Sequence, residues 1–231
     1  MTIPQGTLPE ATVPETMMPE IIGSARSTYT WAVRMVCEEK GIGYRLTETP
    51  LGAPELRAIH PLGKMPVLRH GSVELFESKA IATYLDRSFA GPQLLPSDPI
   101  SAALTEQWVS LVNTSVDRIL IRLYLYAYIV PKGAGGKPDR AAIEAMMPAV
   151  REQIAVLDSA VAATGHLVGD RFTFADINLL PILYRFRQAP EGAETLAAAS
   201  HLTGYYERHA QRPAFVRTIP PPGVPGRAKA G

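Results

Sequence analysis

The sequence predicts an α/β domain followed by an all-helical domain. Between residues 20 and 90 the hydrophobic period switches repeatedly between strand-like and helix-like spacing, which indicates a layered α/β domain. A turn-rich stretch at residues 90–99 marks the domain boundary, and beyond it no strand pattern is longer than four residues. The predicted units are an N-terminal extension (1–19), the α/β domain (20–88), a linker (89–97), a helical bundle domain (98–215) and a flexible tail (216–231).

The elements of the first domain are expected in the order β-α-β-α-β-β-α. Thr28–Lys40 is predicted to be a helix because apolar residues recur on one face, and Gly41 can supply the left-handed residue that ends it. His70-Gly71 between two short apolar runs predicts a tight hairpin. The expected strands are 20–23, 44–47, 65–68 and 73–76, and the expected helices are 28–40, 54–59 and 78–86.

The second half is predicted to contain helices alone. Residues 100–130 read as a long, largely apolar helix that is bent or broken somewhere. A glycine-rich loop at 132–138 separates this helix from three more, predicted at 139–163, 173–186 and 194–209.

Composition excludes several classes of function. The 231 residues carry 23 basic and 22 acidic side chains, so a strongly basic nucleic-acid-binding protein is excluded. The single cysteine, Cys37, excludes a disulfide framework, iron–sulfur ligation and zinc sites made of several thiolates. The sequence has no uncharged apolar run of about eighteen residues, which predicts that no helix spans a membrane.

The two ends of the chain are rich in proline. Prolines recur at every fifth position of residues 1–19, and this segment contains no lysine or arginine. We expect it to be extended and to be neither a secretory signal nor a transit peptide, so a cytoplasmic location is predicted. Prolines at 220–222 and 225 lead into a short tail that is expected to be flexible as well.

The peptide Lys64-Met65-Pro66-Val67-Leu68 places a proline inside a strand pattern. Proline cannot donate to a strand ladder, so it belongs at an edge, a strand start or a special turn. A cis bond between Met65 and Pro66 would aim the main-chain groups of Val67 outward, where an extended peptide could pair with them. An ordinary trans proline at a sheet edge is the alternative, and proline statistics alone favour it.

Glu77-Ser78 lies directly between the predicted hairpin and the helix that follows. A helix N-terminus offers free N–H groups and partial positive charge, so Ser78 suits a ligand carboxylate. Glu77 beside it suits a ligand ammonium, and the pair suits the head group of an α-amino acid. The alternative is that Ser78 caps a helix and binds nothing.

These residues closely resemble the glutathione-binding half of the soluble glutathione S-transferases. The likeness runs from Lys64-Met65-Pro66-Val67-Leu68 to Leu75-Phe76-Glu77-Ser78-Lys79-Ala80, and Thr173-Phe174-Ala175-Asp176 is similar to a capping box of that family's helical domain. This resemblance implies a thioredoxin-like N-terminal domain and a cis bond before Pro66. It also implies that the next residue, Val67, pairs with the cysteinyl backbone of glutathione, and that Glu77 and Ser78 bind the γ-glutamyl end.

The resemblance also places the catalytic group between the first strand and the first helix. In serine-type bacterial members this region carries the pattern Ser-x-Arg-Val-Arg, which we match to Thr30-Trp31-Ala32-Val33-Arg34. The match places Ser27 at the catalytic serine, with Thr28 and Tyr29 as rivals. Ala32 stands where the pattern has its first arginine. A hydroxyl that donates to sulfur, aided by the helix dipole, would stabilise a thiolate whose ordinary pKa is near 8.5.

Further residues are expected around glutathione and its partner substrate. Lys64 could bind the glycine carboxylate of glutathione, and His60 is a weaker candidate for the same role. Trp108 and Tyr124 on the first helix of the second domain could line an apolar pocket for the electrophile, although aromatic residues on a helix more often belong to the core.

Three other features predict no chemistry. Cys37 is expected to be a buried, inert thiol, so the cysteine-dependent members of the family fit poorly. The glycine-rich loop 132–138 lacks the spacing of a phosphate loop. His201 and His209 have no third ligand nearby, so no metal is expected.

The resemblance implies a glutathione transferase that prepares the thiolate for attack on a small electrophile, as in detoxification. Glutathione-dependent isomerisation is one alternative, but those relatives carry Ser-Ser-Cys where this chain has Ser27-Thr28-Tyr29, and Gln-Ser where it has Glu77-Ser78. A non-catalytic module that binds glutathione is the other. The resemblance implies a homodimer, and neither nucleic acid nor a membrane is expected as a partner.

Overall fold

Four short strands form the sheet of the N-terminal domain, in the order β2-β1-β3-β4. The computed structural model describes residues 17–221. β1 (Glu20–Gly23) pairs in parallel with β2 (Arg45–Glu48), whereas β3 (Val67–His70) runs antiparallel to both β1 and β4 (Val73–Phe76). The element order is the predicted β-α-β-α-β-β-α, which confirms the α/β class of this domain.

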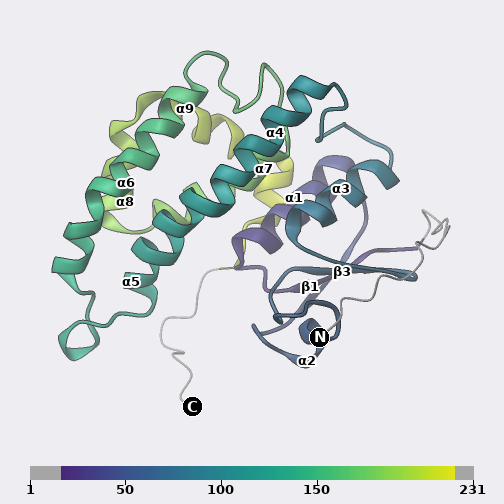
Figure 1. Cartoon of the computed structure of the whole chain (residues 1–231), viewed down its shortest axis with the longest axis horizontal. Helices are drawn as coiled ribbons and strands as arrows, with labels where there is room; N and C mark the ends of the chain where they lie inside the picture. Colours follow the sequence, from purple (N-terminus) through teal and green to yellow (C-terminus); the bar gives the residue numbers. More distant parts are fainter. Residues whose placement is uncertain (1–16, 222–231) are drawn as a thin grey trace.

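Helices cover both faces of this sheet (Figure 1). α1 (Thr28–Lys40) and α3 (Ser78–Ser88) pack against each other on one face, and the short α2 (Pro54–Ile59) lies on the other. α1 ends as predicted, because Gly41 adopts the left-handed conformation with a φ of 70°.

The helical domain begins with a continuous helical run whose middle is a π-helix. α4 (Pro99–Leu111) leads into the π-helix η1 (Val112–Leu125), and α5 (Tyr126–Ile129) completes the run. The backbone stays helical at both junctions. In place of the bend or break expected within residues 100–130, the structure has a change from α-helix to π-helix and back. A π-helix bonds residue i to i+5, and it therefore stacks residues five apart on one face.

The rest of the domain contains more helices than predicted. They are the single 3₁₀ turn η2 (Ala134–Gly136) and the helices α6 (Arg140–Val161), α7 (Phe174–Phe186), α8 (Pro190–Ala198), α9 (Ser200–His209) and α10 (Pro213–Thr218). The prediction of one helix over 194–209 is wrong, since Ala199 leaves the helical region with φ −96° and ψ 88°. No glycine or proline marks this break, so the alanine-rich sequence conceals it.

The two domains share one core. Thr173 and Asp176 form the predicted capping box that starts α7. The Trp31 ring of α1 packs against Tyr184 of α7 and Phe215 of α10, with ring centroids 4.9 and 5.0 Å apart. These contacts fix the N-terminus of α1 beside the C-terminal half of α7.

The structure continues past residue 215, where we expected the helical domain to end. Thr218 is fully buried, and its Oγ1 accepts a hydrogen bond of 2.7 Å from the Trp31 indole N–H. At the other end, the His70 ring bonds the carbonyl of Met17 at 2.7 Å. Residues 1–16 of the predicted extension and 222–231 of the predicted tail lie outside the described residues. Across residues 17–221, no helix has the length and apolar character needed to cross a membrane.

Candidate active site

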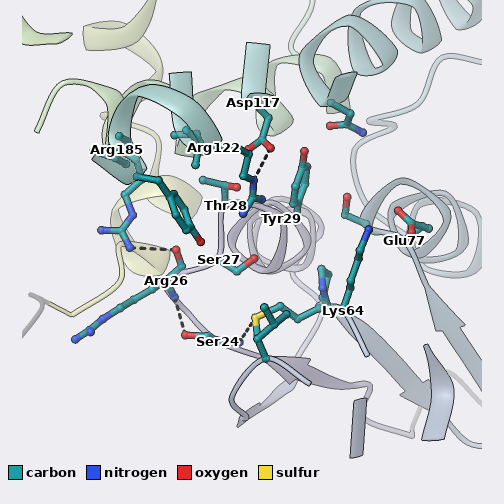
Figure 2. Close-up of a pocket in the computed structure, with 18 of the residues that line it drawn as sticks. Ser24, Arg26, Ser27, Thr28, Tyr29, Lys64, Glu77, Asp117, Arg122 and Arg185 are labelled. Atoms are coloured by element: carbon teal, nitrogen blue, oxygen red, sulfur yellow. Dashed lines mark hydrogen bonds and ion pairs between the residues drawn. The ribbon is translucent and has the colours of Figure 1, made fainter. Parts of the chain in front are cut away.

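A pocket of about 790 Å³ opens between the two domains at the N-terminus of α1 (Figure 2). The residues here called the N-terminal wall are Ser24, Arg26, Ser27, Thr28, Tyr29, Leu51, His60, Lys64, Met65, Pro66, Glu77 and Ser78. Those called the helical wall are Asn113, Asp117, Ile121, Arg122, Leu125, Tyr126, Ile129 and Arg185. Most of the predicted site residues are thus brought together in one pocket.

Ser27 occupies the N-cap position of α1 and is partly exposed to the pocket. Its Oγ accepts a hydrogen bond of 3.3 Å from the Thr30 N–H, the usual N-cap contact. Accepting this bond leaves the hydroxyl proton of Ser27 available to donate elsewhere. A ligand atom in front of Ser27 would also face the positive end of the α1 dipole.

The two rivals of Ser27 are placed differently. Thr28 is the first residue of α1, one position past the N-cap, and is 6% exposed while it still lines the pocket. The Tyr29 side chain reaches toward Asp117 of the helical wall, away from Ser24 and Ser27 (Figure 2). Burial raises the pKa of Tyr29, and the negative charge of Asp117 raises it further. Tyr29 therefore stays protonated and its hydroxyl is directed at the second domain.

Glu77 and Ser78 form a strained turn into α3. Glu77 has a φ of 67°, and it is the only described residue other than glycine with a positive φ. Such backbone strain costs of order 1–3 kcal/mol and collects at functional sites. Ser78 follows as the first residue of α3 and is 5% exposed, although it still lines the pocket. The turn thus presents a carboxylate and a helix N-terminus side by side.

The His60 side chain contacts the Glu77 carboxylate. Its Nδ1 accepts a hydrogen bond of 3.0 Å from the Leu62 N–H, so the ring proton lies on Nε2. That Nε2 stands 3.5 Å from the Glu77 carboxylate, while the His60 side chain is nearly fully buried. The structure therefore turns His60 toward Glu77, whereas we expected it to bind a ligand carboxylate.

The bond between Met65 and Pro66 is cis, as predicted. Val67, however, lies inside the sheet, opposite Ile22 of β1 and Phe76 of β4, and it does not line the pocket. The prediction that its main chain faces outward fails because β3 is an interior strand with neighbours on both sides. Met65 precedes the paired part of β3 and lines the pocket instead.

An ion pair on η1 forms the centre of the helical wall. The Arg122 Nε donates to the Asp117 carboxylate at 2.8 Å, and Asp117 is 4% exposed. The second oxygen of Asp117, Oδ1, is buried without a hydrogen-bond partner. The Arg122 guanidinium lies 5.9 Å from the Tyr29 ring centroid and 5.8 Å from that of Tyr126. Because Asp117 and Arg122 are five residues apart, the π-helix places them on one face.

The aromatic residues predicted for the electrophile pocket do not reach it. Tyr124 is fully buried, where its hydroxyl donates to Glu191 at 3.0 Å and accepts from the Gly192 N–H at 2.7 Å. Trp108 is partly buried against the core and does not line the pocket. Tyr126, the first residue of α5, lines the pocket in their place.

Comparison with known proteins assigns the family. Sequence models of the "Glutathione S-transferase, N-terminal domain" and "C-terminal domain" match residues 21–93 and 140–208. The chain belongs to the glutathione S-transferase family. Glutathione S-transferase 3 of Zea mays is 34% identical over 204 residues, which cover 82% of this chain and 90% of that protein.

Solved glutathione S-transferases share the fold. The apo structure of glutathione S-transferase III has a TM-score of 0.78 at 29% identity, covering 90% of this chain and all of that one. A theta class enzyme of Xanthomonas axonopodis pv. citri, solved with glutathione bound, has a TM-score of 0.76 at 28% identity and covers 88% of this chain and 98% of its own.

Membership in the glutathione S-transferase family confirms the thioredoxin-like domain and the helical domain. It also confirms the predicted activity, which is the transfer of glutathione, the co-substrate, to an electrophile. It does not confirm the serine-type bacterial subgroup, because the relatives include plant enzymes. Within residues 17–221 no cluster of three or more His, Cys, Asp or Glu side chains could hold a metal. Cys37 is fully buried, and burial raises the pKa of its thiol.

The charged residues of the helical wall were not predicted from the sequence. Asp117 and Arg122 stand inside a largely apolar helix, and that contrast was the available signal. Arg185 gave none, since an arginine near the end of a helix is ordinary.

Proposed function

We propose that this glutathione S-transferase activates glutathione at Ser27, whose hydroxyl donates a hydrogen bond to the thiolate. The observation that carries the proposal is the N-cap geometry: Thr30 uses the acceptor side of the Ser27 hydroxyl, and the donor side is left for a ligand in the pocket. Lowering a thiol pKa by about 2 units requires about 2.7 kcal/mol. One charge-assisted hydrogen bond and the helix dipole together supply an energy of this order.

The rest of the N-terminal wall suits the remainder of glutathione. We propose that Glu77 receives the α-ammonium group and that Ser78 with the α3 N-terminus receives the α-carboxylate of the γ-glutamyl end. The main chain of Met65 and the Lys64 ammonium are proposed for the cysteinyl backbone and the glycine carboxylate. His60 acts as a positioning residue for Glu77. This assignment draws support from the lining of the pocket and from the strained turn at Glu77.

The reaction follows from these placements. The thiol proton leaves to solvent, and the sulfur lone pair forms a bond to the electrophilic carbon. A leaving group such as chloride departs with the electrons of the broken bond. Because the protein holds both reactants in one pocket, proximity adds to thiolate stabilisation. The homodimer that the family resemblance implies, and the cytoplasmic location predicted from residues 1–19, stay predictions.

A glutathione titration that records the ultraviolet absorbance of the thiolate tests this proposal. The bound thiol should titrate about 2 pH units below free glutathione, and Ser27→Ala should return most of that shift. Binding without thiolate absorbance at neutral pH would favour the non-catalytic glutathione-binding module instead. An absence of binding would overturn the site assignment.

A further inference from the structure

Arg185 of α7 is a partly buried cation without an acidic partner. Its side chain donates to two neutral oxygens, the Arg26 carbonyl at 3.1 Å and the Gln188 side chain at 3.4 Å. Within residues 17–221 no carboxylate forms an ion pair with it. Burial lowers the pKa of Arg185, and the positive charge of Arg26 lowers it further. An uncompensated cation on a pocket wall is a site at which an anion would be stabilised.

The charge of Arg122 is balanced, in contrast to that of Arg185. Asp117 lies 2.8 Å from the Arg122 Nε, so this pair is close to neutral. The guanidinium plane stands near the rings of Tyr29 and Tyr126, and Ile121 lies on the same wall. The centre of the helical wall therefore offers planar and apolar surface rather than net charge.

The carboxylates of the pocket do not neutralise Arg185. Of the carboxylates in residues 17–221, two line it, Glu77 and Asp117. Asp117 is already paired, and Glu77 lies across the pocket beside Lys64, on the side opposite Arg185 (Figure 2). Glutathione bound along the N-terminal wall would leave the surface between Arg122 and Arg185 to the second substrate.

We propose that the electrophile taken by this pocket has a planar apolar body that bears a carboxylate, and that Arg185 binds this carboxylate while the body packs against Arg122 and Tyr126. A guanidinium matches a carboxylate in shape and can donate two parallel hydrogen bonds to it. The inference rests on the proposed function, since it assumes that glutathione occupies the N-terminal wall.

A matched pair of electrophiles tests the proposal: chlorodinitrobenzoate and its neutral amide, chlorodinitrobenzamide. In both, sulfur displaces chloride from the same ring carbon and chloride leaves with the bonding electrons. Each kcat/KM is divided by the rate constant of the uncatalysed reaction with glutathione, and the ratio of benzoate to benzamide is the readout. This ratio does not depend on the fraction of folded enzyme.

We expect a ratio of about ten or more in the wild type, and about a tenfold fall in Arg185→Gln, the loss typical of one charge-assisted hydrogen bond. Arg118→Gln is the matched control, because Arg118 is an exposed arginine of η1 that does not line the pocket. Its ratio should change less than twofold. A wild-type ratio near one would overturn the proposal, as would an equal fall in both variants.

Two further readouts separate this proposal from the proposed function. If Arg185→Gln raises the glutathione KM equally with both electrophiles, Arg185 belongs to the glutathione site and the proposal is overturned. Calorimetry with the two glutathione conjugates, the reaction products, measures binding without turnover. Tighter binding of the carboxylated conjugate without turnover supports the anion site and contradicts the catalytic function. If neither conjugate binds, both the carboxylate site at Arg185 and the proposed function are overturned.

Discussion

The two walls of the pocket are built in different ways. The N-terminal wall depends on backbone conformations: the N-cap at Ser27, the cis bond before Pro66 and the positive φ of Glu77. The helical wall depends on side chains along one face of η1 and at the end of α7. Side chains on a helix can be exchanged without refolding the chain, whereas a special backbone turn cannot. The first wall therefore suits a constant ligand, glutathione, and the second suits a variable one.

The largest expected effect tests the N-terminal wall at the sulfur. Ser27→Ala should lower kcat with chlorodinitrobenzene by about tenfold to a hundredfold, because the thiolate loses its donor. The fall should be largest below the pKa of free glutathione and should shrink as pH rises, since solvent then ionises the thiol. Steady-state kinetics across this pH range measures both effects.

The rival hydroxyls provide the comparison for Ser27→Ala. Thr28→Val and Tyr29→Phe should each lower kcat less than about threefold, because Ser27 holds the N-cap position in front of α1 and Tyr29 reaches toward Asp117. A larger loss in Tyr29→Phe than in Ser27→Ala would transfer the role to the tyrosine and would connect sulfur activation to the helical wall.

A smaller effect is expected at the γ-glutamyl end. Ser78→Ala should weaken glutathione binding by about 1–2 kcal/mol, because the ligand carboxylate loses one donor in a buried place. Ser88→Ala at the exposed end of the same helix is the control and should leave the dissociation constant unchanged. Calorimetric titration with glutathione measures both, and unchanged affinity in Ser78→Ala would count against the assigned site.

Much of the N-terminal wall could be predicted because its signals are local. The N-cap and the Glu77-Ser78 turn each follow from a few consecutive residues, and the cis bond before Pro66 follows from the family resemblance of one short peptide. The strand ladder is not local, and here the prediction failed: Val67 was expected to face a ligand, but β3 is flanked by β1 and β4. Which strand lies at a sheet edge depends on pairing between distant segments.

The helical wall could not be predicted because its geometry departs from the regular α-helix. Sequence patterns assume a period of 3.6 residues, whereas η1 bonds residues five apart over 14 residues. This shift brings Asp117 and Arg122 together. Tyr126 follows η1 directly and lines the pocket, while Tyr124 is buried against Glu191. The partners of a side chain in a bundle are set by tertiary packing and not by its neighbours in sequence.

The smallest expected effect tests whether the two walls act independently. Asp117→Asn keeps the shape of the side chain but leaves Arg122 without a compensating charge. Kinetics with the benzoate and benzamide pair should show about a threefold rise in preference for the carboxylated electrophile. The gain stays small because the Arg122 side chain is 45% exposed and solvent screens its charge. The glutathione dissociation constant should shift less than twofold, since Asp117 stands on the wall opposite Glu77 and Lys64 (Figure 2). A loss of glutathione affinity as large as that of Ser78→Ala would mean that both substrates share the ion pair, and the division of the pocket into a constant and a variable wall would then be wrong.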